Sequence, residues 1–185
     1  MDTGDEKRAK IAQLRAKTTE LTELVGKARN DVWSFSALPE GTLGIPRGAI
    51  TEISGRHGTG KTQLVLNFLT ENPTTRAAWI EEDLTIYPRA IWQKKIDLNR
   101  ILFVEARENF AWALQQVLKS GIFEILILSG RLNELQLRRL QLDAKKSRTS
   151  CILLRESPTL QGRWPIALQL GFKTRRQLEI LKGMS

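Results

Sequence analysis

The sequence predicts an α/β fold: a mainly parallel sheet covered by helices and preceded by an N-terminal helix. Short apolar runs of strand length alternate with segments whose apolar residues recur every three or four positions. A glycine-rich segment separates the first of these strands from the first of these helices. The length of 185 residues suits a single core. Such alternation is typical of parallel sheets, whose strands are joined by helices.

The N-terminal helix is expected over residues 6–29, where Ile11, Leu14, Leu21 and Val25 form a narrow apolar stripe. A stripe of this width suits packing against one neighbour, either the core of this chain or a second chain, so oligomerisation through this helix stays open. The expected organisation is an N-terminal helix over 1–30, an α/β core over 31–172 and a basic C-terminal tail over 173–185.

Strands of the core are expected where apolar residues alternate every two positions, and helices where they recur every three or four positions. A Gly- and Pro-rich connector over 32–48 leads into them. Residues 163–170 are expected to add an edge strand, and 173–182 carry weak helical spacing. The other expected strands are 49–54, 76–80, 101–105, 123–128 and 150–155, and the expected helices are 61–70, 88–95, 110–119 and 133–146.

Composition limits the class of protein. Hydrophobic residues make up 41% and charged residues 26%, a mixture typical of globular proteins. No apolar run approaches the roughly 18 residues of a membrane-spanning helix, and no signal peptide is evident, so a cytoplasmic location is expected. The single cysteine, Cys151, excludes a disulfide framework within the chain and is expected to be a buried thiol. The net charge of +9 points to nucleic acid first, then to an acidic protein, with a solvated basic surface as the alternative.

The glycine-rich segment matches the phosphate-loop pattern G-x-x-x-x-G-K-[ST]. Its glycines permit positive φ angles and let backbone N–H groups surround phosphates. Lys61 would lie between the β- and γ-phosphates, the Thr62 hydroxyl would bind Mg²⁺, and the following helix would add the positive end of its dipole. His57 is expected to be a loop residue without a catalytic role. The sequence therefore predicts a site for ATP or a related nucleotide with Mg²⁺. Its residues are Gly55, Arg56, His57, Gly58, Thr59, Gly60, Lys61 and Thr62.

The sequence offers few acidic residues that could take part in catalysis. The strand 123–128 ends in Ser129 where most P-loop enzymes have an aspartate that holds magnesium, so weaker metal binding is expected. A carboxylate cluster, 81–83, follows the strand 76–80, and Glu82 and Asp83 are the candidates to orient an attacking water. A solvated acidic loop is the alternative.

Several segments, in order, resemble RecA-family proteins. They are the entry to the loop (44–61) and residues 77–83, 101–103 and 120–127, and the resemblance covers roughly 40–170. It implies ATP and Mg²⁺ as ligands. It also places Asp83 at the family's catalytic glutamate and Ser129 at its magnesium-associated aspartate. Because both residues depart from the family's pattern, rapid hydrolysis is not expected. Nucleotide binding is still expected, and a weak ATPase activity stays open. The family's long DNA-binding loops are replaced by the compact 133–146 and 159–164, so strand exchange by this chain alone is not expected.

Within that superfamily, residues 137–142, 152–155 and 162–164 are similar to ImuA proteins, RecA-like factors sometimes labelled SulA-like division inhibitors. The resemblance implies a role in the SOS response to DNA damage, as an accessory factor in translesion mutagenesis and DNA repair. The implied partners are an ImuB-type Y-family protein and a C-family polymerase.

Basic residues cluster on the helix 133–146 and in the tail. They are candidates for contact with DNA or a protein partner, and a solvated face is the alternative. Among the tryptophans, Trp79 and Trp112 are expected in the core. The candidate contact residues are Arg138, Arg139, Lys145, Lys146, Lys173, Arg175 and Arg176.

Three functions remain open. The first is a nucleotide-dependent adaptor in mutagenic repair, and the second is a DNA-dependent ATPase, a RecA paralogue acting in recombination. The third is a SulA-like division inhibitor whose nucleotide site is vestigial.

Overall fold

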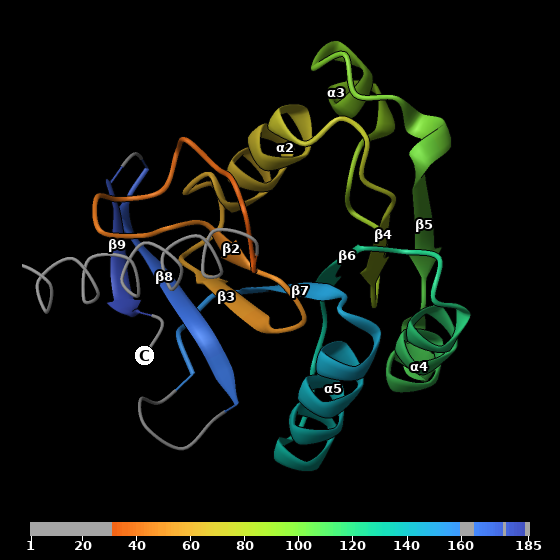
Figure 1. Cartoon of the computed structure of the whole chain (residues 1–185). Coiled ribbons are helices and arrows are strands. Elements are labelled where there is room, and N and C mark those ends of the chain that lie inside the picture. The colour runs from red at the N-terminus through yellow and green to blue at the C-terminus, as the bar shows by residue number, and fades with distance from the viewer. Residues whose placement is uncertain (1–30, 160–164, 176, 184–185) are drawn as a thin grey trace, which may run out of the picture. The chain divides into compact units, whose positions relative to one another are not determined.

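The computed structural model describes residues 31–159, 165–175 and 177–183 (Figure 1). The chain divides into two units, Met1–Val32 and Trp33–Ser185, and the sheet and its helices belong to the second. The helix expected over 6–29 lies outside the described residues.

A seven-stranded sheet forms the centre of the second unit, in the order β5-β4-β6-β7-β3-β8-β9. All neighbouring strands are parallel except β8 and β9, which form an antiparallel pair. Two short strands, β1 (Val32–Trp33) and β2 (Ile45–Pro46), make a separate two-stranded sheet. The strands of the large sheet are β3 (Ile50–Ser54), β4 (Ala77–Glu81), β5 (Ile101–Glu105), β6 (Ile125–Ser129), β7 (Ser150–Arg155), β8 (Ile166–Thr174) and β9 (Gln177–Lys182).

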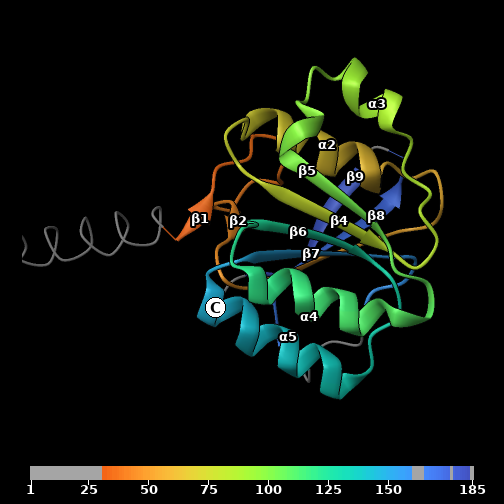
Figure 2. The same cartoon turned by 90° about the vertical axis from the view of Figure 1, so that its right-hand side faces the viewer.

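Helices cover both faces of the sheet, as Figure 2 shows. One face carries α2 (Lys61–Glu71) and α3 (Pro88–Gln93), and the other carries α4 (Phe110–Ser120) and α5 (Glu134–Ser147). Each face buries its own apolar layer because the central strands are apolar on both sides. Two single-turn 3₁₀ helices, η1 (Leu98–Arg100) and η2 (Arg107–Asn109), flank β5.

The predicted fold class is confirmed, and each core strand and helix expected between 49 and 155 forms within a few residues of its expected bounds. Asn133 begins α5 with a capping box, in which its side chain accepts from the Gln136 N–H at 2.9 Å. Among the described residues, no helix is long and apolar enough to cross a membrane.

Three expectations were wrong. The strand expected at the edge is β8, which lies between β3 and β9. The weak helical spacing of 173–182 belongs to the end of β8 and to β9, because the apolar Leu178 and Ile180 alternate and pack against the α2 side of the core. Trp112 is 64% exposed, since the buried stripe of α4 passes through Phe110, Ala113 and Leu114 instead.

Candidate phosphate-binding site

The phosphate loop leaves the carboxyl end of β3, in the interior of the sheet. Residues 55–60 connect β3 to α2, and β3 has parallel partners on both sides, β7 and β8. The Gly55 N–H donates to the Arg155 carbonyl at 3.1 Å, which joins the start of the loop to the end of β7. Ligands of open α/β sheets bind at this edge, beyond the carboxyl ends of the strands.

Three glycines shape the loop. Gly55, Gly58 and Gly60 have φ angles of +154°, +74° and +112°, a region that side chains with a Cβ rarely adopt. Gly60 is the N-cap of α2, and no side chain caps the helix there. The first N–H groups of α2 are therefore left for an anion, as in other phosphate sites at helix N-termini.

Lys61 lies folded against the loop. Its ammonium donates to the carbonyl oxygens of Gly55 and Arg56, the latter at 3.1 Å. Burial lowers the pKa of Lys61, and the negative charge of Glu156 acts in the opposite direction. Thr62 is exposed in the first turn of α2, where its hydroxyl is accessible to a metal ion bound with a nucleotide.

The β8–β9 hairpin forms a wall beside the loop. A Cβ placed on Gly55 would lie 2.8 Å from the Phe172 Cβ, and one on Gly60 would lie 3.8 Å from the Phe172 ring and 3.6 Å from the Arg175 carbonyl. A Cβ on Gly58 would lie 3.9 Å from Arg175 Nη2. The loop glycines thus allow the hairpin to approach closely, in addition to permitting their backbone angles.

Glu156 is a site residue that the sequence analysis missed. It directly follows β7, and its carboxylate pairs with the His57 side chain in the loop. Both side chains are exposed, at 65% and 90%, so the pair is solvent-screened. Its position after a buried strand was a usable signal, but the sequence does not reveal that β7 lies next to β3.

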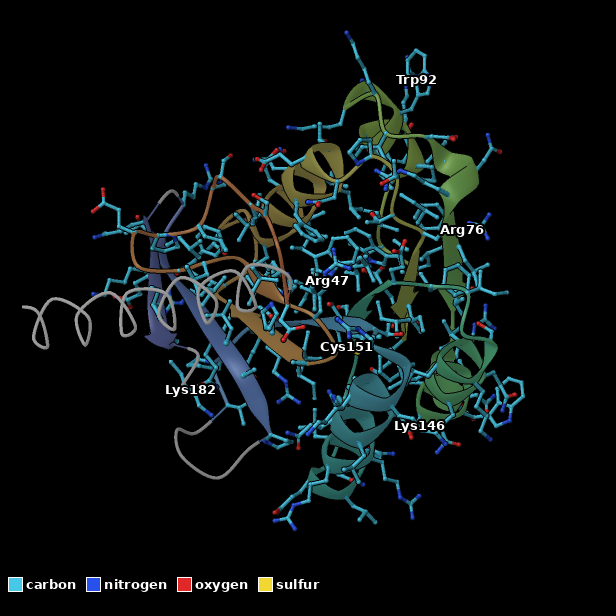
Figure 3. The ribbon with its side chains drawn as sticks, in the orientation of Figure 1. Arg47, Arg76, Trp92, Lys146, Cys151 and Lys182 are labelled. Carbon is cyan, nitrogen blue, oxygen red and sulfur yellow. The ribbon has the colours of Figure 1, made fainter. Side chains whose placement is uncertain are left out.

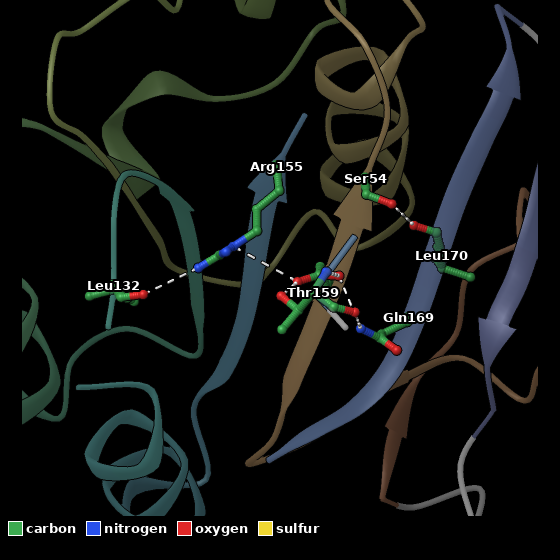
Figure 4. Close-up of polar contacts among 7 residues, drawn as sticks. Ser54, Leu132, Arg155, Thr159, Gln169 and Leu170 are labelled. Atoms are coloured by element: carbon green, nitrogen blue, oxygen red, sulfur yellow. Dashed lines mark hydrogen bonds and ion pairs between the residues drawn. The ribbon is translucent and has the colours of Figure 1, made fainter. Parts of the chain in front are cut away.

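A buried polar cluster holds the segment after β7 in place (Figure 4). The fully buried Glu52 carboxylate accepts from the Thr159 N–H at 2.9 Å, from the Thr159 hydroxyl and from Gln169 Nε2 at 3.1 Å. Arg155 lies 3.8 Å from the same carboxylate and donates to the Leu132 carbonyl at 3.4 Å. Because Glu156 lies between Arg155 and Thr159, these contacts fix its backbone beside the loop.

The three carboxylates of the predicted acidic cluster, 81–83, lie in different surroundings. Glu81 is buried, and its carboxylate accepts from Trp79 Nε1 at 3.0 Å and from the N–H groups of Thr85 and Ile86 at 2.5 and 3.2 Å. Glu82 Oε1 accepts from the Arg131 N–H at 2.6 Å. Asp83 is exposed. Glu81 is therefore a structural residue that shapes the following loop.

The strand order separates Glu82 and Asp83 from the phosphate loop. They follow β4, and β6 and β7 lie between β4 and β3. With strands about 4.8 Å apart, the ends of β4 and β3 are about 14 Å from each other. Ser129, at the end of β6, is opposite Glu81 in the sheet and brings no negative charge to a metal ion. Within the described residues, no group of three or more His, Cys, Asp or Glu side chains is placed to hold a metal.

The predicted DNA or partner contacts lie on two separate elements. Arg138, Arg139, Lys145 and Lys146 are exposed on α5, and Arg138 pairs with Glu134 at 2.8 Å. On the hairpin, Lys173 pairs with Glu179 at 2.5 Å, Arg175 lies at the turn, and Arg176 lies outside the described residues. Figure 3 shows the separation, with Lys146 on α5 and Lys182 on β9. The described members of this set therefore lie on two different elements, α5 and the β8–β9 hairpin.

The chain has a RecA-like fold, in which a loop of the pattern G-x-x-x-x-G-K-[ST] follows an interior strand. A solved structure similar to this chain is the crystal structure of the RadB recombinase, at 17% identity and a TM-score of 0.53. The similarity covers 69% of this chain and 76% of that one. Comparison with protein-family models and with curated proteins finds no match.

Proposed function

We propose that this protein is a RecA-like, ATP-binding accessory factor in DNA repair, with Mg²⁺ as the accompanying ion. The observation that carries the proposal is the phosphate loop itself. Three glycines with positive φ, an uncapped helix N-terminus and Lys61 converge at the carboxyl end of an interior strand. Gly55, Gly58, Gly60 and Lys61 would hold the phosphates, and Thr62 would contribute its hydroxyl to the metal.

Binding with slow hydrolysis is the activity that these residues support. Glu81 is held by its own loop, Glu82 is bonded to the Arg131 N–H, and Asp83 follows β4, which two strands separate from β3. Ser129 supplies no charge to magnesium. Such a site favours a nucleotide-dependent adaptor over a fast ATPase, because hydrolysis requires a positioned water and a stabilised metal.

The biological setting of the proposal is translesion mutagenesis in the SOS response, within an assembly that holds an ImuB-type Y-family protein and a C-family polymerase. This part rests on the resemblance of residues 137–142, 152–155 and 162–164 to ImuA proteins. The second candidate is a DNA-dependent ATPase acting in recombination, which the likeness to the RadB recombinase favours.

The test is a titration of the purified protein with a fluorescent ATP analogue and Mg²⁺. Lys61→Ala is the test variant, and Lys119→Ala, which removes an exposed lysine at the end of α4, is the matched control. Binding that is lost in Lys61→Ala and kept in Lys119→Ala supports the proposal. If the unaltered protein does not bind the analogue, the proposal fails and the vestigial site of a division inhibitor becomes the better interpretation. Turnover stimulated by single-stranded DNA would favour the recombination ATPase.

A further inference from the structure

Arg175 lies at the turn of the β8–β9 hairpin, directly beside the phosphate loop. Its Nη2 atom is 3.9 Å from the point where a Cβ on Gly58 would lie, and its carbonyl oxygen is 3.6 Å from the corresponding point on Gly60. The basic composition of this segment predicted contact with DNA or a partner. The geometry points elsewhere: we propose that Arg175 binds the phosphates of the nucleotide held by its own chain. This inference rests on the proposed function.

The hairpin is held firmly against the loop. β8 pairs with β3, the strand from which the loop emerges, and Ser54 is opposite Gly171 in that pair. The next residue, Phe172, fills the space left by the missing side chains of Gly55 and Gly60. The guanidinium is therefore presented by a packed element in register with the loop, which reduces the entropy lost when it binds a ligand.

Two neighbouring lysines are already engaged, whereas the Arg175 guanidinium is not. The Lys61 ammonium bonds to two loop carbonyls, and Lys173 pairs with Glu179 across the hairpin. Within the part of the chain that the structure describes, the Arg175 guanidinium has no hydrogen bond or ion pair. It can turn toward a ligand without breaking an existing contact.

The charge of a bound nucleotide favours a further cation beside Lys61. A nucleoside triphosphate brings several negative charges, and the carboxylate of Glu156 adds another near Lys61. A guanidinium can bind two phosphate oxygens at once with parallel hydrogen bonds, which a lysine cannot do. Arg175 thus supplements Lys61 from the β8–β9 hairpin, which is remote from the loop in sequence.

The experiment measures the affinity for Mg-ATP and, separately, for a single-stranded oligonucleotide. Arg175→Gln removes the guanidinium, Arg175→Lys keeps its charge, and Arg76→Gln removes an exposed arginine directly before β4 as the matched control. Arg175→Gln is expected to weaken Mg-ATP binding about tenfold, the usual effect of losing one charge-assisted bond. Arg175→Lys should recover only part of that loss, and Arg76→Gln should change the ATP affinity by less than about twofold.

The outcomes separate this inference from the proposed function. If the unaltered protein does not bind Mg-ATP, the proposed function fails and the role of Arg175 fails with it. If it binds Mg-ATP and Arg175→Gln behaves like Arg76→Gln, only the inference is overturned. Loss of oligonucleotide affinity with unchanged ATP affinity would assign Arg175 to nucleic acid and would also overturn it. Urea unfolding of each variant shows whether the fold is retained.

Discussion

Replacing Gly55 with alanine tests how closely the phosphate loop and the hairpin pack. The new methyl group would lie 2.8 Å from the Phe172 Cβ and 2.8 Å from the Thr59 hydroxyl oxygen. Ordinary contacts between carbon atoms are about 3.5–4.0 Å, so the hairpin or the loop must move by about 1 Å. Overpacking of this kind costs about 1–3 kcal/mol, and the φ of +154° adds about 1–3 kcal/mol for a residue with a Cβ. We expect the free energy of unfolding to fall by about 2–6 kcal/mol.

Urea unfolding, followed by tryptophan fluorescence and circular dichroism, measures this change. Gly183→Ala is the control, because a Cβ there meets nothing within 4 Å and its backbone is unstrained. It should alter the free energy of unfolding by no more than about 0.5 kcal/mol. If Gly55→Ala is as stable as Gly183→Ala, the described contact between Phe172 and the loop is wrong. The argument for Arg175 would then lose its geometric basis.

Three further changes test other parts of the structure. Arg100→Met removes bonds of 2.6–3.1 Å to carbonyl oxygens at the end of α2 and in the turn that follows it, and should reduce the free energy of unfolding in urea by about 2 kcal/mol; an unchanged midpoint contradicts this role. Glu81→Gln should destabilise the protein by about 1–3 kcal/mol yet leave ATP affinity unchanged, so a selective loss of turnover would instead indicate catalysis by Glu81. Burial raises the pKa of Cys151 above its ordinary value of 9.0, so a thiol reagent at pH 8 should label it only as the protein unfolds, and stability should fall as the pH rises above 9.0. Rapid labelling of the folded protein would show that the thiol is accessible.

The sequence predicted the local elements well because each carries its own periodicity. The apolar strand 123–128 and the capped helix after Asn133 are defined by neighbouring residues, and so is the phosphate loop. The order of strands depends on contacts between distant segments, which no local pattern reports. Glu156 was missed for this reason, and Glu82 and Asp83 were expected nearer to the loop than the sheet places them.

Two wrong expectations, for the segment 173–182 and for Trp112, have causes that lie in the local sequence. In β9, Leu178 and Ile180 alternate as in a strand, but Leu181 also suits a helical spacing, so the short segment was ambiguous. Trp112 lies two residues after the buried Phe110 and therefore on the outer side of α4. Its aromatic character suggested burial where its helical position indicated exposure.

The place of β3 in the sheet has a consequence for how the chain folds. Ile50 pairs with Cys151 on one side and with Ile166 on the other, so both neighbours of this strand are synthesised long after it. While the chain leaves the ribosome, β3 has two unpaired edges, which are prone to pairing with other chains. The phosphate loop also lacks the hairpin that packs against it until the last strands arrive. Such distant pairings slow folding, and we expect the newly made protein to depend on chaperones until β8 is in place.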